Sequence, residues 1–236
     1  MYEAVFGEIC FRLPFSPLHV SVFEWLELCP SQLNPSCFAY LKAFDLVCRF
    51  LHLLITRELF FIIFTIQQGL DKDGGFSLVS FRQRQVLFEA FTIENLKFQE
   101  EFFLVRPRTW VALRNVLKFV ERLHADTDVV STRVPRFHFY WSRDHFKHTP
   151  NMFKCSYVGL TEQNKKGYAR ILEFVRSFSR AVVEFEDGNP VLDSRGNPVT
   201  EHRAIHARSL VRSKDPMALL GMLVTLTILS LTVFLY

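Results

Sequence analysis

The chain has 236 residues, of which 49% are hydrophobic, and its formal net charge is only +4. It can therefore bury a real core, as one domain or as two small ones. Its five scattered cysteines form no CxxC pair, which argues against a complete disulfide framework and favours a reducing compartment. The modest charge permits a nucleic-acid partner but does not require one.

Two further features of the composition bear on the core and on the N-terminus. Phenylalanine occurs 26 times, which predicts an aromatic-rich core. The N-terminus carries Glu3 and Glu8 and has no basic region before an apolar run, so we expect no secretory signal peptide.

The N-terminal part contains three helix starts. Ser16 and Asn34 each precede a proline, and Thr56 precedes a third apolar stretch that runs towards Ile66. A serine, asparagine or threonine side chain can accept from a free backbone N–H, and proline at the first helical position loses no hydrogen bond. Apolar residues then recur at helical spacing, so we expect a three-helix core. A membrane span over Phe50–Ile66 is the alternative, but three ionisable residues lie inside it: His52, Arg57 and Glu58.

The remainder of the chain mixes expected strands and helices. Short strands are expected at Phe76–Phe81, Phe102–Val105, Arg136–Trp141 and Val182–Phe185. Helices are expected at Thr92–Gln99, Thr109–His124, Leu160–Ser179 (with Thr161 as its cap) and His202–Lys214. Asp126–Val134 is expected to be a loop. These elements predict one helix-rich α+β unit, in which an N-terminal helical group covers a small mixed sheet.

Five cationic residues are weak candidates for nucleic-acid contacts. Two follow the first predicted strand and three are spaced by four residues on the helix predicted at Thr109–His124: Arg82, Arg84, Arg114, Lys118 and Arg122. A basic row on one helix face can lie along a phosphate backbone, although such a row is more often the solvated side of an amphipathic helix.

The segment RFHFYW at Arg136–Trp141 alternates aromatic side chains. As a strand, it would place Phe137, Phe139 and Trp141 on one face. Such a face can stack nucleic-acid bases, but in a phenylalanine-rich chain we expect it to pack beneath the helices.

No constellation for catalysis, for a metal or for a cofactor is recognisable. Four possible zinc ligands match no zinc-finger spacing: His138, His145, His148 and Cys155. The acids that a metal-dependent transposase or integrase would need have no common spacing or strand context: Asp45, Asp126, Asp144 and Glu184. We therefore expect neither a cofactor nor an enzyme.

The C-terminal segment Met217–Tyr236 contains no charged residue. A helix of about 20 residues rises about 30 Å, which matches the hydrocarbon thickness of a bilayer. Basic residues precede the segment, so the sequence predicts a tail anchor with the body in the cytosol. A buried terminal helix or a misjoined gene model are the alternatives, and the nucleus or cytoplasm would then be the location.

Several short motifs occur in an order that resembles a known family. They are Leu13-Pro14-Phe15-Ser16, Cys29-Pro30-Ser31-Gln32-Leu33-Asn34-Pro35-Ser36, Val79-Ser80-Phe81, Phe103-Leu104-Val105-Arg106-Pro107 and Phe139-Tyr140-Trp141-Ser142-Arg143-Asp144-His145-Phe146. From Tyr2 to about Leu220, the chain resembles the gypsy-type transposase domain of plant transposon-derived proteins. The resemblance implies a transposon origin but supplies no catalytic residues.

The sequence thus predicts two parts: a gypsy-type transposase-like domain at 1–215 and a transmembrane-like helix at 217–236. The function expected is that of a non-catalytic interaction module, tethered to a membrane through Met217–Tyr236 and able to bind a protein partner. The alternative is a nucleic-acid-binding accessory protein of a retroelement.

Overall fold

A computed structural model of the chain describes residues 3–7, 9–68, 76–80, 87–89, 116–123, 129–140, 153–178, 180–182, 185–186, 189–202 and 204–223. The first helices and strands, with two 3₁₀ turns (η), are α1 (Glu3–Gly7), α2 (Pro17–Leu26), η1 (Pro30–Gln32), α3 (Pro35–Phe50), α4 (Arg57–Phe61), β1 (Phe64–Gln68), β2 (Phe76–Ser80), β3 (Leu117–Leu123), β4 (Val129–Pro135) and η5 (Tyr157–Gly159). The later ones are α6 (Glu162–Arg176), β5 (Arg180–Val182), β6 (Phe185–Glu186), β7 (Asn189–Pro190), β8 (Thr200–His202) and α7 (Ala207–Arg212).

The helix starts that the sequence predicted are confirmed by their hydrogen bonds. The Ser16 and Thr56 hydroxyls accept from the backbone N–H groups three residues later, at 3.4 and 3.1 Å. Asn34 Oδ1 accepts from the Ser36 N–H at 3.0 Å, and the Thr161 hydroxyl accepts from the Asn164 N–H at 3.2 Å. A cap of this kind stabilises a helix by about 1 kcal/mol, and its chemistry is local enough to be recognised in a sequence.

The core is built around α3, in which most side chains are buried. Two groups of aromatic rings pack on it. One contains Phe44, Phe60 and Phe64, with the rings of Phe60 and Phe64 stacked at 4.5 Å between centroids. The other contains Phe11, Phe23 and Phe38 around the buried His19. The expected aromatic-rich core is confirmed.

The described strands form four separate antiparallel pairs, which corrects the expected mixed sheet. The pairs are β1–β2, β3–β4, β5–β8 and β6–β7. The third N-terminal helix is also shorter than predicted, because α4 ends at Phe61 and β1 begins at Phe64. The run from Phe60 to Ile66 is aromatic and β-branched, and its second half pairs with β2 from Phe64↔Ser80 to Gln68↔Phe76. A strand partner close by in the chain outweighs the helical spacing here.

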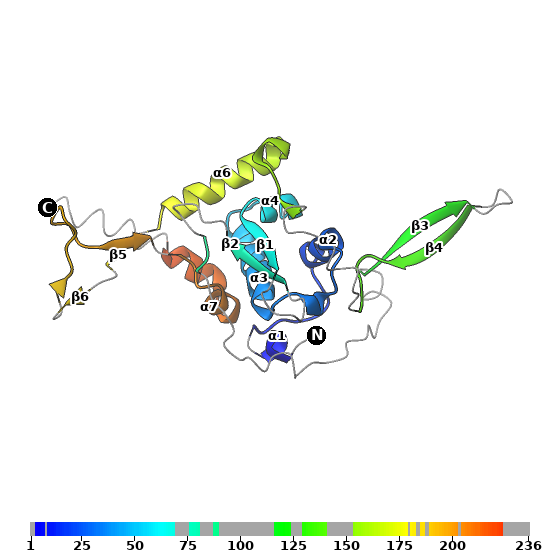
Figure 1. Ribbon diagram of the computed structural model, residues 1–236, viewed down its shortest axis with the longest axis horizontal. Helices are drawn as coiled ribbons and strands as arrows, with labels where there is room; N and C mark the ends of the chain where they lie inside the picture. Colours follow the sequence, from blue (N-terminus) through cyan, green and yellow to red (C-terminus); the bar gives the residue numbers. More distant parts are fainter. Residues whose placement is uncertain are drawn as a thin grey trace.

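Helix α6 packs across the helical group (Figure 1). Its Asn164, which is buried, accepts a hydrogen bond from the Thr56 hydroxyl at 2.9 Å. Gly167 lies against Leu59 so closely that an added Cβ would be 3.1 Å from Leu59 Cδ2. These contacts fix α6 relative to the start of α4.

The C-terminal part of the prediction needs correction. Residues 200–202 form a strand, and α7 covers only Ala207–Arg212 of the helix predicted at His202–Lys214. Within the described residues, no helix has both the length and the apolar character needed to cross a membrane. The helix that begins at 216 is described to 223, and 224–236 lie outside the described residues. The predicted fold class is therefore corrected to an α+β fold in which the described chain has no transmembrane helix.

Candidate interaction surface

Strands β3 and β4 form a two-stranded arm that extends away from the helical body (Figure 1). The strands pair in register from Leu117↔Pro135 to Leu123↔Val129. Valine and threonine make up four of the seven residues of β4, and β-branched side chains suit a pleated surface. We call residues 116–123 and 129–140 the hairpin arm.

Ion pairs join the base of the hairpin arm to Glu24 of α2. Lys118 Nζ lies 2.8 Å from one carboxylate oxygen of Glu24, and Arg136 Nη1 lies 3.4 Å from the other. Partial burial alone would raise the pKa of the Glu24 carboxyl, but the hydrogen bond and charge of Lys118, together with Arg136, outweigh it and lower that pKa. Arg136 also donates from Nε to the Leu117 carbonyl at 3.2 Å, which links the two strands of the arm at its base.

An aromatic anchor completes this attachment. Phe137, two residues after the end of β4, is buried, and its ring centroid lies 5.3 Å from that of Phe23 and 5.8 Å from that of Phe15. The hairpin arm thus joins the aromatic group around His19 through Phe137, close to the end of β4.

The hairpin arm also exposes aromatic side chains. Phe119 is 63% exposed, and the Arg133 guanidinium lies over its ring at 5.3 Å from the centroid. Phe139 and Tyr140 are also exposed. Aromatic residues and arginine are the side chains most enriched where proteins bind other proteins, which makes this surface the strongest candidate for a binding site.

The cationic residues singled out in the sequence are not brought together as a helical row. Lys118 lies in β3 and is paired with Glu24, and Arg122 lies in the same strand opposite Val130. The helix predicted at Thr109–His124 is wrong for 117–123, because these residues pair with the segment that was expected to be a loop at Asp126–Val134. The other three candidates lie outside the described residues: Arg82, Arg84 and Arg114.

The expected aromatic strand at Arg136–Trp141 is also corrected. The described residues 136–140 do not form a strand, and only the first of the aromatic side chains among them is buried. Phe139 and Tyr140 extend to solvent instead of packing beneath helices, while Trp141 lies outside the described residues. The exposure of Phe119, Phe139 and Tyr140 had no signal in the sequence, since exposed and buried aromatic residues read alike without a known register.

Reactive side chains are not clustered in the described part of the chain. Burial, with a smaller contribution from the charge of Asp45, raises the pKa of the Cys48 thiol to about 12, so this thiol stays protonated and unreactive. Burial also raises the pKa of Cys155. Asp45 is bound by Arg49 at 2.8 Å, and in the described part of the chain no three His, Cys, Asp or Glu side chains lie close enough to hold a metal ion.

Comparison of the chain with known protein families, with characterised proteins and with solved structures found no match.

Proposed function

We propose that this chain is a non-catalytic interaction module, derived from a transposon of the gypsy type, that binds a partner protein through its hairpin arm. The observation that carries the proposal is the exposed Phe119 ring with the Arg133 guanidinium over it, on an arm anchored to the core by Phe137. A rigidly attached aromatic–arginine pair loses little conformational entropy when a partner covers it. The motif resemblance supports the transposon origin.

A nucleic-acid partner is the second candidate, because the arm carries more basic than acidic residues. Its cations are Lys118, Arg122, Arg133 and Arg136, and its acid is Glu121. Two of these cations, Lys118 and Arg136, are already bound to Glu24 at the base, which reduces the charge available to phosphates. This neutralisation favours a protein partner.

The test uses a random peptide library displayed on phage and selected against the full chain. Selected peptides should bind the Phe119→Ser variant at least about 10-fold more weakly, because an aromatic hot spot contributes about 2 kcal/mol or more. Val158→Ser is the matched control, since Val158 is 86% exposed on η5, outside the arm. Binding that is unaffected by Phe119→Ser and by Phe139→Ser would contradict the proposal.

Titration with single-stranded DNA and RNA separates the two candidates. We expect weak binding that is lost as salt rises, as for non-specific contacts with phosphates. Sub-micromolar, sequence-selective affinity at physiological salt would instead favour the nucleic-acid candidate.

A further inference from the structure

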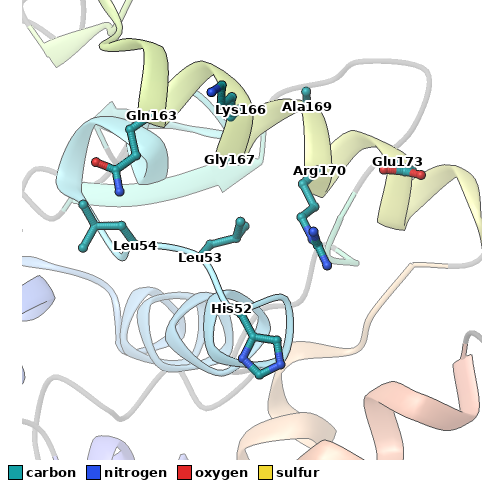
Figure 2. A pocket seen from close by; sticks show the side chains of 9 residues that line it. All are labelled: His52, Leu53, Leu54, Gln163, Lys166, Gly167, Ala169, Arg170 and Glu173. Carbon is teal, nitrogen blue, oxygen red and sulfur yellow. The ribbon is translucent and has the colours of Figure 1, made fainter.

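An open groove of about 490 Å³ lies between α6 and the turn that follows α3 (Figure 2). One wall is the turn His52-Leu53-Leu54, and the other is α6, which contributes Lys166, Arg170 and Glu173. In Figure 2, the Arg170 side chain extends from α6 towards the turn. The groove lies within the helical body and is separate from the hairpin arm.

The turn wall is fixed by backbone geometry. His52 has φ = 53°, in the left-handed region, and the Leu53 N–H donates to the Cys48 carbonyl at 2.8 Å. A left-handed residue followed by such a bond ends a helix in a defined conformation. Leu53 and Leu54 are therefore held at the groove by the end of α3.

The α6 wall is fixed by its contacts with the same helical group. The Thr56–Asn164 hydrogen bond and the close approach of Gly167 to Leu59 hold the first half of α6. Phe174 packs on Phe50 at 5.7 Å between ring centroids and holds its second half. Both walls are thus in place before any ligand binds.

Two features of the groove favour a ligand with both acidic and apolar groups. Lys166 and Arg170, four residues apart on α6, outnumber the one acid in the lining, Glu173. Leu54, on the opposite wall, is 56% exposed. A ligand that carries negative charge on one side and an apolar group on the other would complement both.

We propose that this groove binds an acidic peptide segment of a partner protein, with carboxylates at Lys166 and Arg170 and an apolar side chain on Leu53 and Leu54. The volume lies in the range of ligand sites that enclose a few side chains. A free phosphate would leave the leucines uncovered. A nucleic-acid strand usually stacks its bases on several aromatic rings, and the imidazole of His52 is the one ring in the lining.

The probe is a fluorescein-labelled peptide of alternating leucine and glutamate or aspartate, and its control replaces every acid by glutamine or asparagine. Anisotropy titrations with the full chain should show saturable binding of the acidic peptide. The double variant Lys166→Gln/Arg170→Gln should bind it roughly 5- to 30-fold more weakly, as expected for two partly exposed charge contacts. Leu54→Ser should also weaken binding, while Phe119→Ser, on the hairpin arm, should leave it unchanged.

The matched control is Lys154→Gln/Arg195→Gln, which removes the same charge from exposed sites outside the groove. It should change the affinity less than about 2-fold, because neither residue lines the groove and salt screens exposed charges. Equal losses in the two double variants, equal binding of the neutral peptide, or no saturable binding would each overturn the inference. Full displacement of the peptide by millimolar inorganic phosphate would also overturn it, because the site would then recognise only an anion.

Discussion

His19 should make the stability of this protein depend on pH. The side chain is buried among phenylalanine rings, and its Nδ1 lies 2.6 Å from the Ser16 hydroxyl oxygen. Its Nε2 has no hydrogen-bond partner among the described residues, so a proton there would be an unsatisfied buried donor. Burial, and then the charge of Lys42, lower the pKa of His19 from 6.5 to about 3.

The sign of the effect follows from proton binding. Between pH 6.5 and 3, the unfolded chain protonates His19 and the folded chain does not, so acid favours unfolding. Each pH unit in this range costs about 1.4 kcal/mol, so lowering the pH from 7.5 to 4.5 should decrease the free energy of unfolding by about 2.7 kcal/mol. Any folded pKa below about 4 gives nearly the same value, because the folded state is then unprotonated throughout this interval.

Urea unfolding at a series of pH values measures this decrease. His19→Phe keeps an aromatic ring in the cluster and should lose most of the pH dependence. His52→Gln, which removes a histidine from the surface, is the control and should keep it. Glu24 becomes protonated mainly at lower pH, which is why the interval stops at 4.5. Equal pH dependence in the wild type and in His19→Phe would refute the reasoning.

Three further experiments test the packing of the body by urea unfolding. Thr56→Ala and Asn164→Ala should each destabilise the protein by about 1–3 kcal/mol, because each removes one partner of the Thr56–Asn164 hydrogen bond. Their double-mutant cycle should show about 1 kcal/mol of coupling, and strict additivity would mean that this hydrogen bond does not hold α6. Phe60→Ala should cost about 3–5 kcal/mol, because its fully buried ring stacks on a neighbour in the core; a cost below about 1 kcal/mol would place that ring at the surface. Gly167→Val should destabilise by about 1–3 kcal/mol through overpacking on α4, while Ala169→Val, exposed on the same helix, should cost less than 1 kcal/mol; equal costs would indicate a propensity effect and not a contact.

Local signals in the sequence predicted more of the fold than non-local ones did. The caps at Ser16, Asn34, Thr56 and Thr161 depend on a few neighbouring residues, and all four are confirmed. The strand at 117–123 was mistaken for a helix because its apolar residues also fit helical spacing, and its true partner was read as a loop. Pairing between strands depends on both segments, so neither reveals it alone.

The sequence predicted some residues of the candidate surfaces but not how these residues are arranged. The sequence drew attention to the aromatic residues after β4 and to Lys118, but not to the acid on α2 that binds Lys118 across 94 positions of sequence. The groove forms because the turn after α3 and α6 lie side by side, and the periodicity of hydrophobic residues does not indicate this contact. The membrane prediction rested on hydropathy of a segment of which only 217–223 is described, and the described helices did not support it.

The ammonium group of Lys42 has a consequence for how the polypeptide is made. This side chain, which extends from α3, donates to the Cys10 carbonyl at 3.1 Å and to the Val211 carbonyl at 3.4 Å. The Ile205 N–H donates to the Leu87 carbonyl at 2.9 Å. Segment 204–211 therefore completes a core whose first part is formed by the N-terminal helices. On the ribosome, α3 of the nascent chain therefore remains incompletely buried until residues 204–211 have emerged from the exit tunnel. During that interval, its phenylalanine-rich surface is a natural substrate for ribosome-associated chaperones.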